Sequence, residues 1–392
     1  MNALRSLLQD RRFRTGALPW TIVMLVLVNA GVWVHHGQLE AGRRANLLTT
    51  TPSRSARYDM SVGEDLGSYF GRIPDGREKP LVILTGMSQM YAINDARPGD
   101  QTISEWLDDA LAPKGVRVIG LAAPNLSNEE AIMYLLATAT APETHPAAFV
   151  YAICFDKLRN VDLRPALKNF LFSRPVLKEA WKSACQGGLG DRYPMACEKM
   201  MATLARGDEP AEKQQVSTSE MLEEKARTAA ARLVPLVADR QNLNSALMTE
   251  IFLLRNRVLN IKASSKRPII QSRYELNQQF IQLLVDLAER AKIRLFFYII
   301  PLNPLSENPY IPAQYAEFKT WVEELAHARG VAFANLENVV PAGEWGFNSE
   351  GPDFKHFKGS GHRITANALL EEFGPALQDL VRAPVARETR VP

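Results

Sequence analysis

From residue 80 onward, short continuous apolar runs alternate with segments whose apolar residues recur at helical spacing. Continuous apolar runs of this length are typical of strands that are buried on both faces. The predicted strands span residues 81–86, 116–123, 147–155, 293–301 and 331–337. The predicted helices between them span residues 102–115, 127–139, 274–292 and 312–330. This alternation favours an α/β fold, a three-layer sandwich in which helices cover both faces of a parallel sheet.

Residues 160–270 depart from this alternation. They contain a charged, alanine-rich segment at 218–239 and then an amphipathic run, but no clear strand. We interpret this stretch as a helical insertion that rises from the top of the sheet. The α/β domain as a whole is expected to span residues 79–380, with a flexible tail at 381–392.

The N-terminal part of the chain includes one long apolar segment without charge. No Asp, Glu, Lys or Arg occurs between Thr15 and Leu39, and residues 16–34 are long enough to cross a bilayer as a helix. Trp20 and Trp33 lie near the two ends of this segment, where amphipathic rings favour the headgroup region. We therefore predict a transmembrane anchor at 16–34, with a buried core helix and a cleaved signal peptide as the alternatives.

The flanking residues favour a retained anchor with one orientation. Residues 1–15 carry four arginines, which favour a cytoplasmic N-terminus, although two arginines beyond the span weaken this bias. Apolar sequence continues to Val34, past the small residues at 28–30 where a signal peptide could be cut. Residues 35–78 then form a polar juxtamembrane linker. The expected location is the inner membrane, with the main domain in the periplasm or otherwise outside the cytoplasm.

Composition narrows the class of protein. Hydrophobic residues make up 46% and charged residues 23%, which provides enough apolar sequence for a packed core. The formal net charge of +3 gives no reason to expect nucleic acid as a partner. Cys154 lies in an apolar run and is expected to be a buried thiol. Cys185 and Cys197 could form a disulfide in an oxidising compartment or stay reduced, and without nearby histidines their spacing does not resemble a zinc site.

Ser88 follows the first predicted strand after Thr85 and Gly86, in the sequence LVILTGMSQM. A serine on the turn after a buried strand is in the position of a nucleophile at the carboxyl edge of an α/β sheet. The alternative is that Ser88 caps the following helix by accepting a hydrogen bond from a free backbone N–H group. The choice depends on whether the chain supplies a base and an acid that orients the base.

A carboxylate and a histidine three residues apart lie near the other end of the predicted domain, in GPDFKHFKGSGH. Asp353 can accept a hydrogen bond from one imidazole nitrogen of His356 and leave the other nitrogen facing an active site. We expect both residues in a loop before the last helix, and the alternative is an ordinary polar loop. Among the six histidines, His362 is the main competitor of His356, but it lacks a carboxylate three residues earlier.

These two motifs resemble those of the SGNH (GDSL-type) hydrolase superfamily. The resemblance rests on TGMSQM early in the domain and on DFKHFKGSGH before its last helix, and it covers roughly residues 80–375. The chain is similar to membrane-anchored members that accompany membrane-bound O-acyltransferases in alginate or cellulose acetylation and in D-alanylation of teichoic acid. The resemblance implies that Ser88 is the nucleophile, His356 the base and Asp353 its orienting partner.

Three positions depart from the pattern of that superfamily. Met87 replaces the acidic residue before the serine, and Asn125 stands near the place of a glycine whose N–H group helps to hold the oxyanion. In the third block, Phe155 or Asp156 falls where an oxyanion-binding asparagine is usual. We expect the backbone N–H group of Ser88 and the amide of Asn125 to be the oxyanion donors. Gln89 and Asp156 complete the predicted oxyanion and substrate-binding set.

Charge around the predicted site leaves two questions open. Asp156 would oppose an oxyanion unless a cation pairs with it, and Lys157 and Arg159 are the expected partners. Three further basic residues surround the His356 motif, and they could attract an anionic polysaccharide or simply form a solvated basic surface. They are Lys355, Lys358 and Arg363.

The residues and the resemblance together favour a membrane-anchored, extracytoplasmic serine O-acyltransferase or esterase that acts on a cell-envelope polysaccharide. The alternative is a catalytically weak or inactive protein of the same fold that binds glycan or docks on a membrane-bound O-acyltransferase. A structural envelope protein, in which the serine and the Asp-x-x-His pair are coincidental, is the third possibility. The expected partners are the polysaccharide, the acyltransferase and the inner membrane, and no cofactor or metal ion is expected.

Overall fold

The computed structural model describes residues 79–141, 144–159, 163–208, 265–348 and 351–382. All of these residues belong to one compact unit. The predicted anchor at 16–34, the linker at 35–78 and the alanine-rich segment at 218–239 lie outside the described residues. Within the ranges that are described, no helix combines the length and the hydropathy that a membrane span requires.

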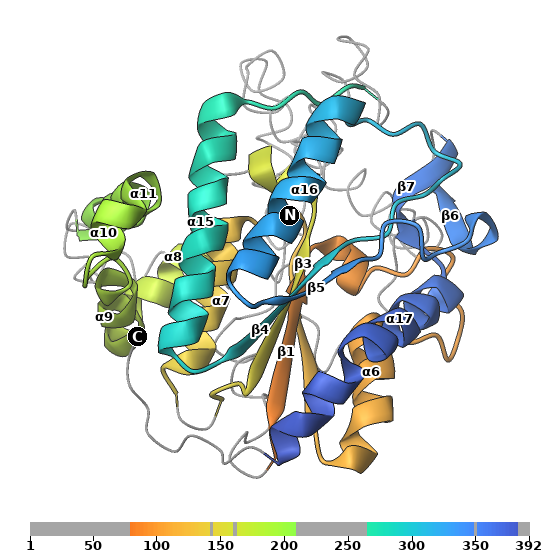
Figure 1. The fold of residues 1–392 in the computed structure, drawn as a ribbon, viewed down its shortest axis with the longest axis horizontal. Helices are drawn as coiled ribbons and strands as arrows, with labels where there is room; N and C mark the ends of the chain where they lie inside the picture. Colours follow the sequence, from red (N-terminus) through yellow and green to blue (C-terminus); the bar gives the residue numbers. More distant parts are fainter. Residues whose placement is uncertain (1–78, 142–143, 160–162, 209–264, 349–350, 383–392) are drawn as a thin grey trace, which may run out of the picture. The chain divides into compact units, whose positions relative to one another are not determined.

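Five parallel strands form the central sheet, in the order β2-β1-β3-β4-β5 (Figure 1). The strands are β1 (Leu81–Gly86), β2 (Arg117–Ala122), β3 (Ala148–Ile153), β4 (Arg294–Ile299) and β5 (Ala332–Asn335). Every residue of β1 and β3 is buried, as expected for central strands that are covered on both faces. The prediction of an α/β fold with a parallel sheet is confirmed, and each predicted strand overlaps an observed one.

The strand order reverses beside β1. The chain passes from β1 to β2 on one side and then returns to β3 on the other side. At such a topological switch point the loops after the strands diverge and leave a crevice at their carboxyl ends. The register pairs Gly86 with Ala122 and Thr85 with Tyr151, so the three strands end at the same level. The loops after β1, β2 and β3 therefore emerge side by side.

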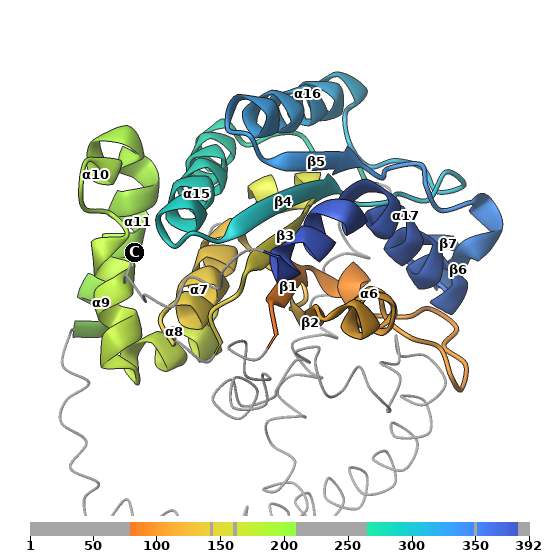
Figure 2. The same ribbon diagram turned by 60° about the horizontal axis from the view of Figure 1, so that its bottom comes forward.

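Helices cover both faces of this sheet (Figure 2). One face carries α6 (Ile103–Leu111) and α17 (Gly359–Gln378), which pack against each other. The other carries α7 (Asn128–Ala139), α15 (Gln271–Arg290) and α16 (Pro312–Ala328). Single 3₁₀ turns connect or end several elements: η1 (Ser88–Met90), η2 (Ala112–Lys114), η3 (Phe155–Arg159), η4 (Ala342–Glu344) and η5 (Asp379–Val381). The three layers of the predicted sandwich are thus present.

The described part of the insertion is helical, as predicted, but it does not rise from the top of the sheet. Its helices are α8 (Pro165–Phe172), α9 (Pro175–Ser183), α10 (Leu189–Arg192) and α11 (Pro194–Asp208). α9 packs on α7, and α11 packs on α15, so these helices extend the helical layer sideways (Figure 2). The fully buried side chain of Trp181 explains the placement, because its indole needs a second apolar layer to cover it. Cys185 and Cys197 form a disulfide that links the end of α9 to α11.

A second, two-stranded sheet stands before the last helix, where the sequence predicts a loop. It pairs β6 (Trp345–Asn348) with β7 (Gly351–Phe357) in antiparallel fashion, with an irregular register. Asp353 and His356 therefore lie on a strand, and the expectation of a loop is wrong. Buried aromatic side chains account for the difference, because Trp345 and Phe357 pack edge to face across the pair.

His362, the competing candidate base, is part of the core. Its side chain is fully buried in α17, and the ring packs edge to face on Phe357 with 4.6 Å between ring centroids. Nε2 lies 3.2 Å from the Ala92 carbonyl oxygen, and Nδ1 has no hydrogen-bond partner among the described residues. Burial lowers the pKa of His362 to about 3. The ring is therefore neutral at ordinary pH and does not face the site.

The buried His362 should make the protein less stable in acid. Its folded pKa of about 3 lies below the unfolded value near 6.5, so protonation favours the unfolded chain as the pH falls from 6.5 towards 3. By pH 4.5 the free energy of unfolding should lose about 2–3 kcal/mol from this group. Urea unfolding between pH 7.5 and 4.5 measures the loss. His362→Phe should remove that part of the slope, and equal slopes in both proteins would contradict the expectation.

Candidate active site

The turn after β1 is shaped by a close approach at Gly86. A Cβ atom at this position would lie 2.7 Å from Met90 Cγ and 2.8 Å from Ala152 Cβ, closer than real carbon atoms come. Only glycine therefore lets η1 fold back against β3. The turn brings the Ser88 side chain to the carboxyl end of β1, where it is partly exposed. The Ser88 N–H group is at the start of this short helix, where backbone donors have no partner within the helix.

Ser88, His356 and Asp353 are in contact in that order. Ser88 Oγ lies 2.8 Å from His356 Nε2. His356 Nδ1 lies 3.1 Å from Asp353 Oδ2 and 3.2 Å from Oδ1. An ionised carboxylate only accepts hydrogen bonds, so Nδ1 carries the proton and Nε2 accepts the hydrogen bond from the serine hydroxyl. The structure thus joins the two predicted motifs into the arrangement of a nucleophile, a base and an orienting acid.

The Asp353 carboxylate organises the backbone around the histidine. Its Oδ1 accepts hydrogen bonds from the backbone N–H groups of Lys355 at 2.9 Å and His356 at 3.0 Å. Burial acts to raise the pKa of Asp353, but the hydrogen bonds from the His356 ring and from these two N–H groups outweigh it, and the pKa is lowered. The group is therefore ionised at neutral pH, as the orienting acid of a triad must be.

Asn94 is a site residue that the sequence did not indicate. It is buried, and its Nδ2 donates to Asp353 Oδ2 at 3.3 Å and to the Phe347 carbonyl at 3.2 Å. A Cβ atom at Gly346 would lie 2.0 Å from Asn94 Cγ, so the glycine makes room for this amide. Nothing in the surrounding sequence YAIND distinguishes this asparagine from one in a turn.

The predicted role of Gln89 in substrate binding stays a prediction, and the structure places its side chain in the core. Its side chain is fully buried, and its Nε2 donates to the carbonyl groups of Pro301 at 2.9 Å and Lys355 at 2.7 Å. Pro301 follows β4 and Lys355 lies within β7, so the buried amide supplies a donor to two carbonyls of separate segments. Gln89 thus ties the strand that carries His356 to the sheet.

Asp156 is paired, but not with the partners that the sequence suggested. Arg267 Nη1 lies 2.8 Å from Asp156 Oδ2, and the ammonium group of Lys355 pairs with the same oxygen. Lys157 instead turns into the core, where its Nζ donates to the Ala152 carbonyl at 2.7 Å and burial lowers its pKa to about 7. The described residues show no ion pair between Asp156 and Arg159. The negative charge of Asp156 is therefore neutralised by Arg267 and Lys355.

The three basic residues near His356 do not form one solvated surface. Lys355 is mostly buried with Asp156, and only 13% of its side chain is exposed. Lys358 donates to the Gly343 carbonyl at 3.0 Å, and the Arg363 guanidinium lies 5.9 Å from the centre of the Trp106 ring. Lys355 differs from Lys358 and Arg363 because it lies on β7, two residues after Asp353, and its side chain points towards the loop after β3.

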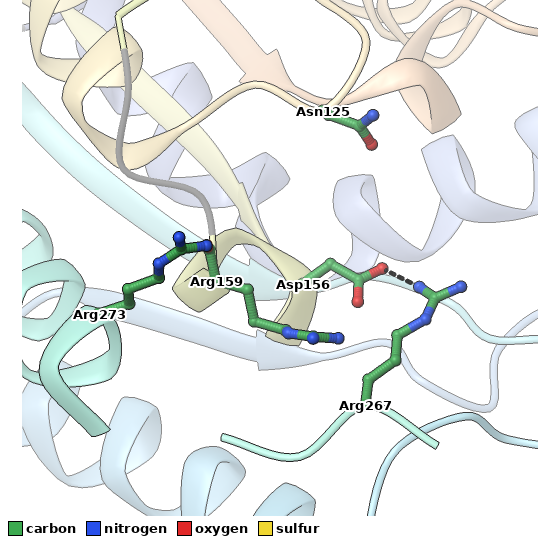
Figure 3. Close-up of a pocket in the computed structure, with 5 residues that line it drawn as sticks. All are labelled: Asn125, Asp156, Arg159, Arg267 and Arg273. Carbon is green, nitrogen blue, oxygen red and sulfur yellow. Dashed lines mark hydrogen bonds and ion pairs between the residues drawn. The ribbon is translucent and has the colours of Figure 1, made fainter. Parts of the chain in front are cut away.

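A pocket of about 280 Å³ opens at this end of the sheet (Figure 3). It is lined by Asn125, Asp156, Arg159, Arg267 and Arg273. Asn125 follows β2 and has a positive φ of 50°, a conformation that asparagine adopts more readily than most residues. No hydrogen bond joins it to Ser88 in the described structure, so its role as an oxyanion donor stays a prediction. Arg267 and Arg273 were missed, although they stand close together in SSKRPIIQSR after the insertion.

Two solved structures are similar to this chain. One is described as a “putative acylhydrolase” from Bacteroides fragilis NCTC 9343; the match has 10% identity and a TM-score of 0.31, and covers 78% of this chain and 90% of that chain. The other is described as a GDSL-like lipase from Bacteroides thetaiotaomicron VPI-5482; here the identity is 10%, the TM-score 0.32 and the coverage 78% and 91%. No protein-family description and no curated protein matches the sequence.

Proposed function

We propose that this protein is a serine esterase or O-acyltransferase of the SGNH type. The observation that carries the proposal is the contact of Ser88 Oγ with His356 Nε2 at 2.8 Å, together with the buried, ionised Asp353 behind the imidazole. A serine hydroxyl is a weak nucleophile on its own, and a base held in this position activates it. The crevice at the switch point of the sheet is where α/β proteins bind their ligands.

The first half of the reaction transfers an acyl group to the serine. Ser88 Oγ attacks the carbonyl carbon of an ester, its proton moves to His356 Nε2, and the carbonyl electron pair moves onto oxygen. The intermediate then re-forms the carbonyl and breaks its bond to the alcohol. The alcohol leaves with the proton from His356, and Asp353 stabilises the imidazolium in between.

The second half removes the acyl group. Water or a sugar hydroxyl attacks the acyl-serine, His356 takes the proton of the attacking group, and Ser88 Oγ receives it when the acyl group leaves. Water gives a carboxylic acid, and a sugar hydroxyl gives a new ester. The same residues serve both outcomes, so esterase and transferase differ in the acceptor that reaches the site.

Oxyanion stabilisation is the part of the site that departs most from the superfamily. The proposed donors are the N–H group of Ser88 and the amide of Asn125, and loss of one such donor typically costs a factor of about 10²–10³ in rate. Asp156 supplies no amide donor, which favours the alternative of a weak or inactive accessory protein. Its pairing with Arg267 and Lys355 favours activity, because it removes an uncompensated negative charge from the neighbourhood.

The proposed cellular role follows from the sequence outside the described residues. A membrane anchor at 16–34 would hold the enzyme at the inner membrane with its site in the periplasm. The substrate is proposed to be a cell-envelope polysaccharide, acylated or deacylated on sugar hydroxyls. A membrane-bound O-acyltransferase is the proposed protein partner, since similar anchored proteins accompany such enzymes.

Removing any member of the triad should abolish acyl-ester turnover. Ser88→Ala and His356→Ala in the full chain should lower kcat/KM for 4-nitrophenyl acetate by about 10³-fold or more, and Asp353→Asn by roughly 10²–10⁴-fold. Exposed residues provide matched controls, namely Ser173→Ala and His327→Ala. Labelling by a fluorophosphonate should occur on Ser88 in the wild type and in the control variants, and it should be absent from Ser88→Ala and His356→Ala. Folded wild-type protein that neither labels nor turns over ester would leave the accessory role in the lead.

Asn94 should act as a positioning residue. Asn94→Ala removes one donor from the Asp353 carboxylate and should lower kcat by about 10-fold, the usual scale of a hydrogen bond to a charged group. KM should change little, because the Asn94 amide reaches Asp353 and not the substrate. Expressing kcat per fluorophosphonate-labelled site separates this effect from a loss of folded protein, and Asn169→Ala, at an exposed position of α8, is the control. An unchanged kcat per labelled site would exclude the role.

A further inference from the structure

Three guanidinium groups gather around the pocket that adjoins the triad. Figure 3 shows the side chains of Arg159 and Arg267 on either side of Asp156, with Arg273 beyond Arg159. They come from η3, from the segment before α15, and from α15 itself. Segments far apart in the sequence thus deliver positive charge to one small space.

The pocket holds more positive charge than its own carboxylate neutralises. Asp156 is the one acidic side chain of its lining, and both Arg267 and Lys355 pair with it. Neither Arg159 nor Arg273 has a carboxylate partner among the described residues. Arg273 Nη1 donates to the backbone carbonyl of Arg159 at 3.1 Å, which places the third guanidinium beside the others.

Arg159 is the least satisfied of the three. Its Nε is buried and has no hydrogen-bond partner within the described part of the chain. Burial lowers the pKa of Arg159, and the positive charges of Arg267 and Arg273 lower it further. Arginine nevertheless stays protonated in proteins, so the repulsion among these groups is a cost that the folded chain carries. An anion in the pocket would remove this cost.

The pocket lies beside the reacting groups. Asn125 and Asp156 follow β2 and β3, and these strands flank β1, which presents Ser88. Neighbouring strands are about 5 Å apart, so groups on their adjoining loops can bind one small molecule. Lys355 makes the link direct, because it pairs with Asp156 and immediately precedes His356.

We propose that this pocket binds an anionic group, a carboxylate or a phosphate, on the alcohol part of the ester substrate or on the accepting sugar. Arg159 and Arg273 would bind the anion through their planar forks, which match carboxylate and phosphate oxygens. The volume of about 280 Å³ is at the lower end for small-molecule sites, which suits one charged residue of a larger substrate. The inference rests on the proposed function, and it narrows the substrate to anionic esters or anionic glycans.

Direct binding tests the inference without requiring turnover. The full chain with Ser88→Ala, purified in mild detergent, is titrated by calorimetry with 3-acetoxybenzoate, 3-acetoxyphenyl phosphate and the neutral methyl 3-acetoxybenzoate. Both anions, or one of them, should bind about 10-fold or more tightly than the neutral ester, the scale of hydrogen bonds between charged groups. The anion that binds better identifies carboxylate or phosphate as the preferred group.

Matched arginine variants locate the binding. Arg159→Gln with Arg273→Gln should remove the preference for the anion, whereas Arg267 stays intact because its loss would remove one of the two cations that pair with Asp156. The control is Arg294→Gln with Arg382→Gln. Arg294 opens β4 at the opposite edge of the sheet, and exposed Arg382 follows α17. This control pair should keep the preference for the anion. In the Ser88→Ala protein with all arginines intact, that preference should weaken as the salt concentration is raised from 0.1 M.

The outcomes separate this inference from the proposed function. Equal binding of charged and neutral esters, or an equal effect of the two variant pairs, would overturn the anion site even if wild-type protein turns over all three esters. Binding of the anion that depends on Arg159 and Arg273 supports the site. If wild-type protein with Ser88 intact then fails to turn over the bound ester, the esterase proposal fails while the ligand class of the pocket stands.

Discussion

The hydrogen bonds to the Asp353 carboxylate determine the geometry of the whole site. Ser88 and His356 are 268 positions apart, and their contact requires β7 to be held in one place against the loop after β1. Asp353 accepts hydrogen bonds from the backbone of its own strand, from the imidazole and from Asn94. A buried carboxylate is stable only with such donors. The carboxylate that binds the His356 imidazole therefore also fixes the strand that carries His356.

Close packing at Gly86 fixes the position of Ser88, just as the hydrogen bonds to Asp353 fix the position of His356. Because β1 is central and apolar, its end can turn only where a side chain is missing, and Ala152 on β3 leaves no room for a Cβ atom. Buried Gln89 then reaches the carbonyls of Pro301 and Lys355, which connects this turn to β7. The position of Ser88 thus follows from core packing, and the hydroxyl needs no strain of its own to face the imidazole.

The sequence was sufficient for the features that depend on local patterns. Apolar runs identified all five strands of the main sheet, and the Asp-x-x-His spacing led to a pair that does meet Ser88, although its catalytic role stays a prediction. The sequence was not sufficient where the conformation of a side chain depends on a partner that is distant along the chain. Gln89 turned inward to carbonyls of remote strands, and Asp156 paired with Arg267 from beyond the insertion. Which partner such a side chain takes depends on which polar and charged groups the folded chain leaves without a partner.

Asp156 shows how a mostly buried carboxylate close to the candidate site is compensated by charge. A buried carboxylate without a partner would be costly, and two cations from other segments, Lys355 and Arg267, pair with it. These cations neutralise Asp156, so it cannot also neutralise Arg159 and Arg273, and the excess positive charge is left to the pocket. Asp156 therefore holds Lys355 and Arg267 at the edge of the pocket, while the charges of Arg159 and Arg273 stay uncompensated among the described residues.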